Sequence, residues 1–315
     1  QTIAGMVAIF TIVSMSRRVQ FFISVLMIFA AYSIAFVGVT ILHEANFRSI
    51  DWMNLKWFAA NSVLTLFAFP LIFIFEKTFG FLSDVSLMEL ADSNSPLLRE
   101  LAYKAPGTFQ HSLQVANLAE AVTFKIGGNP LLVRAGALYH DIGKMERPLY
   151  FIENQNSEFN PHDELSFEES ARIIKDHVIR GIEIAKQRKL PEPIIDFIRT
   201  HHGTSVLQYF YHSFLKNFPE KVPNEELFHY PGPLPFSRET VVLMMADSVE
   251  AASRSLKNAT AENISNLVDN IIDHQMSQGQ FINAPITLKD ISDIRKIFKK
   301  MLMSIYHVRI EYPRT

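Results

Sequence analysis

The sequence predicts an all-α protein in which transmembrane helices precede a second, helical domain, and three observations lead to this prediction. Long uncharged apolar runs occupy the first 80 residues. After residue 83, apolar positions recur at helical spacing and are bounded by helix-capping residues. The period-2 alternation typical of β-strands is not evident in the 315 residues. The predicted domains are residues 1–82 and residues 83–315.

Three apolar runs are predicted to be membrane spans, at about residues 2–16, 19–42 and 57–79. The second run holds 24 residues without a charged side chain. Since a helix of about 20 apolar residues crosses a bilayer, this run is long enough to do so. Three buried core helices are the alternative, but uncharged runs of this length are rare in soluble cores.

The connectors between these runs predict an orientation. Arg17-Arg18 lies between the first two runs with no acidic residue nearby, whereas Trp52 and Trp57 flank the second connector. Basic connectors stay in the cytoplasm, and tryptophan is enriched at membrane interfaces. The chain after residue 76 is therefore predicted to be cytoplasmic.

The composition limits the kinds of partner and site. A formal net charge of -2 gives no reason to expect binding to a nucleic acid polymer. The chain has no cysteine, so a metal would be held by His, Asp and Glu side chains. Seven of the 11 histidines lie between residues 111 and 212.

Helix-boundary signals divide the second domain. Thr108 is a candidate N-cap, Gly127-Gly128 ends a helix, and Ser166 with Glu169 forms a capping box. Helices are predicted at about residues 109–126, 130–142, 166–189, 192–202, 238–256, 261–275 and 287–304, with an ordered loop over residues 215–236.

Five imidazoles and two carboxylates are predicted to project from apolar faces of these helices. They are His111, His140, Asp141, His177, His201, His202 and Asp247. A buried carboxylate such as Asp247 needs a cation, and a buried unpaired imidazole is costly. Imidazoles and carboxylates bind Mn, Fe, Zn or Co, and a pair of these ions needs six or seven ligands with one bridging carboxylate. Several unrelated core histidines are the alternative.

The adjacent pair His140-Asp141 fits such a metal pair. Neighbouring residues on a helix point about 100° apart, so they are poorly placed to share one face. The same divergence suits two side chains that flank two metal ions.

These residues and their surroundings resemble a known family. His111, the pair His140-Asp141 and Asp247 reproduce the H…HD…D signature of HD-superfamily phosphohydrolases. His177 and His201-His202 match the additional histidines of the two-metal branch. The stretches NPLLVRAGALYHDIGK, HHGTSVLQYFY and MMADSVEAASRSL extend the match. The chain is similar to membrane-anchored seven-transmembrane HD-domain proteins, the PgpH type of bacterial cyclic di-AMP phosphodiesterase.

The resemblance implies a site with two divalent transition-metal ions, most often Mn or Fe. One ion is held by His111, His140, Asp141 and Asp247, and the other by His177, His201 and His202, with Asp141 bridging. The implied reaction opens cyclic di-AMP to linear 5′-pApA by a hydroxide that bridges the metals, with Asp141 as a catalytic residue.

The resemblance also implies the setting of the protein. On this resemblance we expect a multi-pass protein of the bacterial cytoplasmic membrane, with the lipid bilayer and a cyclic dinucleotide as partners, and a homodimer is compatible with it. The chain begins with Gln1. It is therefore expected to be a fragment that lacks the family's extracellular domain and first spans.

Two basic and three aromatic residues are further candidates. Lys144 and Arg254 could contact phosphate, although Lys144 could instead cap a helix and Arg254 could instead fix the carboxylate of Glu250. Stacking on a nucleobase could come from Tyr209, Tyr211 and Tyr230, although aromatic residues at such spacing are more often core.

Two other functions stay open from the sequence. Other HD branches act on cyclic di-GMP, alarmones or deoxynucleoside triphosphates. The helical domain could also be a ligand-sensing receptor without turnover. A receptor of that kind is expected to lose ligand residues, and all seven are present here.

Overall fold

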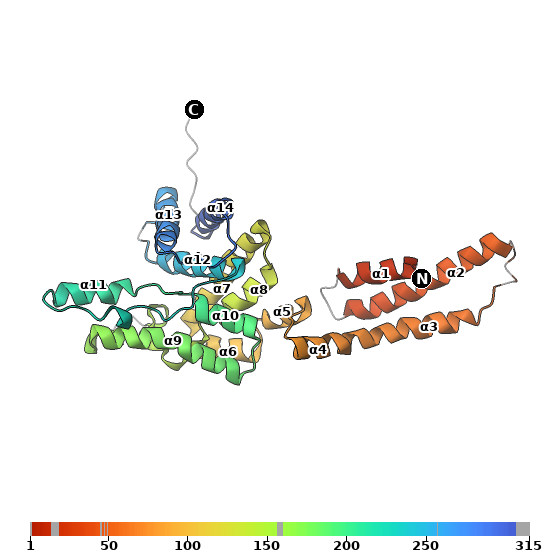
Figure 1. The fold of residues 1–315 in the computed structure, drawn as a ribbon, viewed down its shortest axis with the longest axis horizontal. Helices are drawn as coiled ribbons and strands as arrows, with labels where there is room; N and C mark the ends of the chain where they lie inside the picture. The colour runs from red at the N-terminus through yellow and green to blue at the C-terminus, as the bar shows by residue number, and fades with distance from the viewer. Residues whose placement is uncertain are drawn as a thin grey trace, which may run out of the picture. The chain divides into compact units, whose positions relative to one another are not determined.

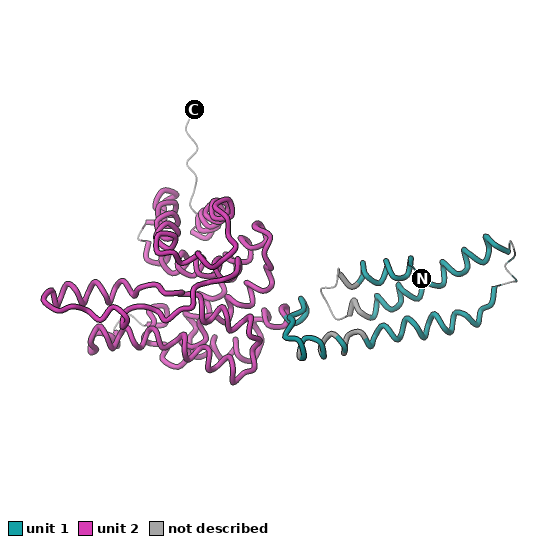
Figure 2. Tube along the Cα trace, viewed as in Figure 1, with its two compact units in different colours: residues 1–86 teal, residues 87–315 magenta. Residues whose placement is uncertain are grey.

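The computed structural model describes residues 2–13, 19–44, 46, 48, 50–155, 160–256 and 258–306. The chain forms two compact units, residues 1–86 and residues 87–315 (Figure 2). Throughout the described residues the regular structure is helical, and the only β-type pairing is an isolated bridge between Val206 and His229. The predicted all-α fold class is therefore confirmed.

The first unit contains α1 (Thr2–Val13), α2 (Val19–Glu44), α3 (Asn54–Leu64) and α4 (Ala68–Phe79) (Figure 1). Helix α2 packs against both α1 and α3. The predicted run 57–79 is divided, because a 3₁₀ turn at Thr65–Phe67 separates α3 from α4. Pro70 has no N–H to donate to the carbonyl four residues earlier, which accounts for the interruption. The end of the predicted run 2–16 lies outside the described residues.

The surface of α2 is apolar. Among the described helices, the segment Phe22–Glu44 alone is long and apolar enough to cross a membrane, with a mean hydropathy of 2.4. Phe22, Leu26 and Ile34 on it are 65%, 68% and 73% exposed. A helix that faces lipid exposes apolar side chains of this kind, and its backbone polar groups are satisfied by hydrogen bonds within the helix.

The second unit is built from ten further α-helices of the described chain and several 3₁₀ turns. The α-helices are α5 (Asp84–Leu90), which begins at the boundary, α6 (Pro96–Lys104), α7 (Pro106–Ile126), α8 (Pro130–Tyr139), α9 (Phe167–Gln187), α10 (Glu192–Thr200), α11 (Gln208–Asn217), α12 (Arg238–Ser253), α13 (Ala261–Ser277) and α14 (Leu288–Ile305). The turns are η3 (Ile142–Glu146), η4 (Pro148–Tyr150), η5 (Ile152–Asn154), η6 (Pro161–Glu164) and η7 (Glu225–Leu227).

Helices α7 and α12 form the core of this unit. They pack against each other, and α7 also contacts α8 and α14. Every residue of the stretch 241–246 on α12 is buried. A helix that is apolar on all sides lies inside a protein. The next residue on this helix, Asp247, is therefore carried into the interior.

Two glycines bring the other elements close to this core. A Cβ atom on Gly136 would lie 2.2 Å from the ring of Phe197, so α8 sits against α10. A Cβ atom on Gly143 would lie 1.9 Å from the backbone oxygen of His177, so η3 sits against α9. These close approaches place the pair His140-Asp141 beside α9 and α10.

The structure corrects several predicted helix boundaries. Helix α8 ends at Tyr139 rather than at residue 142, so Asp141 is not helical and has φ −109° and ψ 16°. Its divergence from His140 therefore arises at a helix end rather than within a helix. Thr108 is not an N-cap, because α7 begins at Pro106.

One further predicted helix boundary in the second unit agrees with the structure, and one helix was not predicted. The capping box of Ser166 and Glu169 opens α9 as expected. Helix α11 was not among the predicted helices and extends into the predicted loop 215–236, which also holds η7. Phe214, on α11, packs with Ala171 and Phe228 in a small apolar cluster, and this tertiary contact was not evident from the local sequence.

Candidate metal centre

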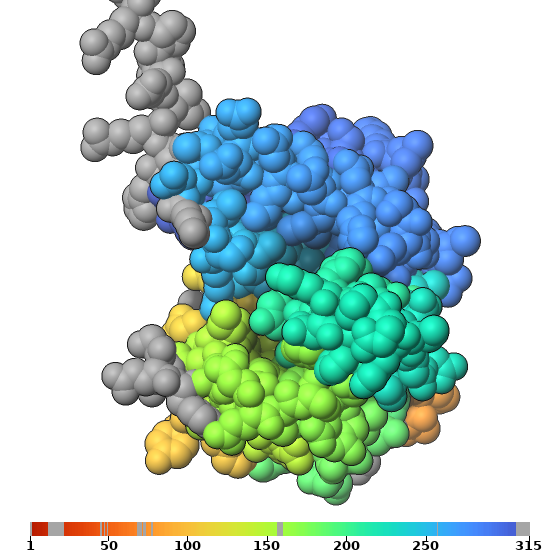
Figure 3. Space-filling view, turned by 90° about the vertical axis from the view of Figure 1, so that its left-hand side faces the viewer, coloured from red at the N-terminus to blue at the C-terminus, as the bar shows by residue number. Residues whose placement is uncertain are grey.

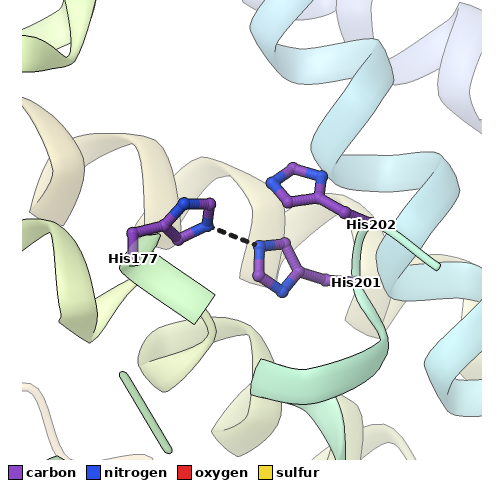
Figure 4. A group of neighbouring side chains, drawn as sticks. All are labelled: His177, His201 and His202. Atoms are coloured by element: carbon purple, nitrogen blue, oxygen red, sulfur yellow. Dashed lines mark hydrogen bonds between the residues drawn. The ribbon is translucent and has the colours of Figure 1, made fainter. Parts of the chain in front are cut away.

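The seven predicted ligand residues meet in two groups inside the second unit. The first group is His177, His201 and His202 (Figure 4), and the second is His111, His140, Asp141 and Asp247. Within each group, one possible ligand atom from every residue lies within 4.8 Å of the others. The residues come from α7, α9, α12 and the C-terminal ends of α8 and α10.

Asp141 lies between the two groups and is 1% exposed. Its Oδ1 atom is 3.4 Å from Nε2 of His177 and 3.6 Å from Nε2 of His201. Its Oδ2 atom is 3.2 Å from Nε2 of His140 and 3.6 Å from Nε2 of His111. Each carboxylate oxygen therefore faces a different set of imidazoles.

Three of the imidazoles are oriented by the backbone of their own helix. The Nδ1–H groups of His140, His177 and His201 donate to the carbonyls of Ala137, Ile174 and Ile198. Because a carbonyl only accepts, Nδ1 carries a proton, and in the neutral ring Nε2 is the atom left with a lone pair for a metal. The Nε2 atoms of His177 and His201 point toward each other at 3.2 Å (Figure 4). Two lone pairs this close favour a cation between them.

The buried polar atoms at this centre fit divalent metal ions. In the described part of the chain, Nε2 of His140 and both carboxylate oxygens of Asp141 have no well-directed hydrogen bond. Burial opposes ionisation of Asp141, but His140 and Lys144 hold its pKa well below the usual range. A buried carboxylate group beside several imidazoles is a donor set that borderline divalent metals prefer.

The protonation of the histidines differs between the two groups. Burial lowers the pKa of His177 to about 3 and that of His202 well below its usual value, so both are neutral at pH 7. Burial also opposes the charge on His140, but Asp141 and Asp247 raise its pKa to about 10. Protons therefore compete with metal ions at His140, and metal affinity decreases as the pH falls.

His111 is oriented by a side chain instead of a backbone carbonyl. Its Nδ1–H donates to Oε2 of Glu250, while its Nε2 is 2.9 Å from Oδ1 of Asp247. Glu250 is buried, and its other oxygen accepts from Nε and Nη2 of Arg254 at 2.8 and 2.7 Å. Arg254 was considered either as a phosphate contact or as a partner of Glu250. Its guanidinium is hydrogen-bonded to Glu250, as the second role requires.

Lys144 turns toward the centre rather than toward the end of a helix. Its Nζ atom is 2.8 Å from Oδ2 of Asp141 and 3.0 Å from Oε1 of Glu153. Burial opposes its charge, but these two carboxylates raise its pKa above the usual value. Lys144 therefore remains a fixed positive charge at neutral pH.

Glu153 is a site residue that the sequence did not indicate. It lies on η5, and its Oε1 also accepts from the hydroxyl of Thr108 at 2.9 Å. A Cβ atom on Gly107 would lie 1.8 Å from the backbone oxygen of Glu153, so only a glycine lets this turn approach α7. No helical periodicity or capping signal in the sequence connects residues so distant in the chain.

A cavity of about 320 Å³ opens on the side of the centre that carries these charges. Its lining includes His111, Lys144, Glu153, Asp247 and Arg254. The cavity therefore combines two candidate metal ligands, His111 and Asp247, with two cationic side chains and the carboxylate of Glu153.

The three candidate tyrosines have different surroundings. Tyr230 is buried and stacks on His202, with ring centroids 4.1 Å apart and an interplanar angle of 28°. Tyr211 packs against Phe228 of the apolar cluster. Tyr209 is 75% exposed. Of the three, Tyr230 alone has a ring contact with a candidate metal ligand among the described residues.

Replacing Glu250 with glutamine is expected to weaken metal binding by about 10–100-fold, because outer carboxylates orient ligand imidazoles and raise their basicity. Titration of the metal-free protein with Mn²⁺ measures the effect. Glu262→Gln, an exposed substitution on α13, is the control. Unchanged Mn²⁺ affinity in Glu250→Gln would show that His111 needs no carboxylate partner.

Two protein families match separate parts of the chain. The family described as HD domain matches residues 108–252, and the family described as 7TM receptor with intracellular HD hydrolase matches residues 1–83. The second match, together with the exposed apolar helix α2, indicates a membrane protein.

Two curated relatives are similar along most of the chain. The cyclic-di-AMP phosphodiesterase PgpH of Bacillus subtilis (strain 168) is 41% identical over 292 residues, which are 93% of this chain and 40% of that protein. The protein of the same name from Listeria monocytogenes serotype 1/2a (strain 10403S) is 44% identical over 274 residues, which are 87% of this chain and 37% of that protein. The chain thus spans about two fifths of the length of these relatives.

Solved structures match the second unit. A crystal structure of the L. monocytogenes phosphodiesterase PgpH HD domain is 46% identical, with a TM-score of 0.65, over 68% of this chain and 100% of that one. The same domain in complex with cyclic-di-AMP matches equally well, over 69% of this chain. This chain therefore belongs to the HD-domain family, in the group whose HD domain accompanies a 7TM receptor segment.

Proposed function

We propose that this protein is a membrane-tethered phosphodiesterase that hydrolyses cyclic di-AMP to linear 5′-pApA. The position of Asp141, which turns one oxygen to each ligand group beside a cavity lined by Lys144 and Arg254, is the observation that carries the proposal. The names of the two PgpH relatives and the similar HD domain in complex with cyclic-di-AMP support the choice of substrate.

The two ligand groups are proposed to hold two divalent ions, Mn or Fe, with Asp141 shared between them. When bound, such ions lower the pKa of water to near neutrality and offset the charge that builds on a phosphate during hydrolysis. The residues of this chain would hold these ions through imidazoles whose Nδ1–H groups donate to backbone carbonyls, as in His140 and His201.

Lys144 is proposed to act on the substrate by its charge. Its ammonium group lines the cavity and is 2.8 Å from Asp141, so a phosphate placed at the metals would lie within its reach. Because its pKa is raised, Lys144 is a poor proton donor, and its role is to stabilise negative charge.

Arg254 lines the same cavity from α12 while it holds Glu250. The part of its side chain that remains exposed could contact the second phosphate of a cyclic dinucleotide.

The setting proposed for this activity is the cytoplasmic membrane of a bacterium, with residues 83–315 in the cytoplasm. The basic pair Arg17-Arg18 supports this orientation through the positive-inside rule. The family description, which names an intracellular HD hydrolase, supports it independently.

A comparison of substrates tests the proposal. The purified chain with Mn²⁺ is incubated separately with cyclic di-AMP, cyclic di-GMP, guanosine tetraphosphate and dGTP, and kcat/KM is measured for each. The expected result is the highest kcat/KM for cyclic di-AMP. A preference for cyclic di-GMP, the alarmone or dGTP, or the absence of turnover with all four, would contradict the proposal.

Substitution of Lys144 with methionine is expected to lower kcat by about 10²–10³-fold while both metals stay bound, because one fixed charge at the phosphate is lost. Steady-state kinetics with metal analysis on the same sample tests this. Lys104→Met is the control, since Lys104 forms only an exposed pair with Glu100. If Lys144→Met loses metal in proportion to its loss of activity, Lys144 instead acts by keeping the metal ligands in place.

A further inference from the structure

His202 is held differently from the other candidate ligand imidazoles. The other four each donate a hydrogen bond from Nδ1, three to a backbone carbonyl and one to Glu250. The imidazole of His202 forms no hydrogen bond with the described residues, and Oδ2 of Asp247, at 3.8 Å from its Nδ1, is beyond hydrogen-bond distance. The His202 side chain is also 23% exposed, whereas the other four imidazole side chains are at most 5% exposed. A different contact is therefore needed to keep this ring in place.

The phenol ring of Tyr230 covers one face of the His202 imidazole. The two rings are stacked, with centroids 4.1 Å apart and an interplanar angle of 28°. The same phenol ring meets His177 edge-on, at 6.2 Å between centroids and an interplanar angle of 81°. Stacked and edge-on aromatic pairs attract each other beyond the apolar area that they bury. The stack therefore fixes the plane of the His202 ring, as the hydrogen bonds from Nδ1 do for the other four imidazoles.

The ring of Tyr230, and not its hydroxyl group, makes this contact. In the described part of the chain, the hydroxyl forms no hydrogen bond with another residue. Burial raises the pKa of Tyr230 above its ordinary value, so the phenol is neutral at pH 7. A phenylalanine at this position would therefore keep the contact with His202.

Tyr230 is held against His202 by the chain that connects the two residues. This connection carries α11 and η7, and Figure 3 shows the teal surface of α11 next to the surfaces of α9 in green and α13 in blue. Its two ends, residues 204–207 and 228–230, pair with each other and form a neck. In the neck, the backbone N–H of Tyr230 donates to the carbonyl of Ser205 at 3.0 Å. The neck thus returns the chain to the imidazole from which it departed.

Gln280, which follows α13, holds the neck from the other side. It is 2% exposed, its Oε1 accepts from the backbone N–H of Thr204 at 3.1 Å, and its Nε2 donates to Oγ1 of Thr204 at 3.2 Å. A Cβ atom on Gly203, which has φ +50°, would lie 2.3 Å from Oε1 of Gln280. The glycine between His202 and Thr204 therefore permits both the backbone turn and the close approach of the amide.

We propose that Tyr230 is a positioning residue of the metal centre. Its ring holds the His202 imidazole in the plane that presents a nitrogen to the ion shared with His177 and His201, and the neck fixed by Gln280 holds Tyr230. This inference rests on the proposed function, since it concerns the ligands of the same two ions. Tyr230 acts through His202 and not by contact with the substrate.

The test titrates the metal-free chain and its variants with Mn²⁺ in a calorimeter, which counts the bound ions and measures both affinities. In Tyr230→Leu, the affinity for one ion is expected to fall about 10–100-fold, as for other residues that orient metal ligands, while the other ion keeps its affinity. Tyr230→Phe retains the ring and is expected to bind both ions like the unaltered chain. Gln280→Met, which loses two hydrogen bonds to the neck, is expected to weaken the same ion about 3–10-fold.

Turnover provides a second measurement on the same variants. Because the role of Tyr230 acts through the metal, kcat of Tyr230→Leu for cyclic di-AMP is expected to rise toward that of the unaltered chain as the Mn²⁺ concentration is raised. A kcat that stays low although two ions are bound would overturn the inference, since it would place Tyr230 in direct contact with the reaction.

Phe214→Leu is the matched control for the loss of an aromatic ring. Phe214 lies on α11 in the same connection, is buried, and packs on Phe228 in the apolar cluster. Its replacement is expected to lower Tm but to leave both Mn²⁺ affinities unchanged. Unchanged affinities in Tyr230→Leu, or an equal loss in Phe214→Leu or Tyr230→Phe, would overturn the inference.

Gln280→Met keeps the test decisive if Tyr230→Leu does not fold. Unchanged Mn²⁺ affinities in a folded Gln280→Met would then overturn the inference. If the unaltered chain itself binds fewer than two Mn²⁺ ions, the proposed function fails. If it binds two ions and the variants behave like it, only the positioning role of Tyr230 fails.

Discussion

Replacing Asp141 with alanine is expected to abolish hydrolysis of cyclic di-AMP, with a loss of at least about 10³-fold in kcat, and to remove both metals. The reason is that its two oxygens face the two ligand groups separately, so a single substitution takes one ligand from each ion. Elemental analysis of the purified variant, combined with a product assay, measures both effects.

Asp176→Ala is the matched control for this substitution. Asp176 precedes His177 on α9, but its carboxylate pairs with Arg180 at the surface. It is expected to keep two metals and normal turnover. Two metals retained in Asp141→Ala would contradict the bridging role.

Replacing Gly143 with alanine is expected to destabilise the second unit. The added Cβ would lie 1.9 Å from the backbone oxygen of His177 and 2.6 Å from the backbone nitrogen of Gly181. Neither backbone atom can rotate away, so η3 and α9 must separate. Overpacking of this kind costs about 1–3 kcal/mol or more, which corresponds to a decrease of about 2–12 °C in Tm for a unit of this size.

The separation of η3 from α9 would also move Asp141 away from His177. Metal content is therefore expected to fall together with Tm, and thermal unfolding with metal analysis measures both. Gly38→Ala is the control, because a Cβ atom there meets nothing within 4 Å in the described chain. An unchanged Tm in Gly143→Ala would show that η3 and α9 can part without cost.

The identity of the candidate ligand residues could be predicted from the sequence, but the pairs that they form in space could not. His140, His177 and Asp247 could be selected because polar groups on apolar helix faces need partners in the interior. That His111 and Asp247 meet across 136 positions depends on the packing of α7 against α12. The resemblance to a known family supplied this arrangement, and helical periodicity could not.

Side chains that act through long-range contacts were less predictable. Glu153 reaches Lys144 only because Gly107 admits η5 against α7. The partner of Lys144 could not be read from its position after Gly143, since both a helix cap and a buried ion pair fit the local sequence.

The positions at which helices end could not be predicted from hydrophobic periodicity either. Residues 130–142 keep an apolar pattern to the end, but α8 stops at Tyr139. The close contact of Gly143 with α9 draws the chain into η3 instead, and it is this change of direction that turns Asp141 between the ligand groups.

Titration of the metal-free chain with Mn²⁺ during turnover of cyclic di-AMP tests most directly whether this is a two-metal phosphodiesterase. The product is identified by mass spectrometry at each addition. The expected result is linear 5′-pApA that appears in proportion to the second equivalent of Mn²⁺ and disappears on chelation. Full activity at one equivalent, or turnover in the chelated protein, would contradict a site in which Asp141 joins two metals.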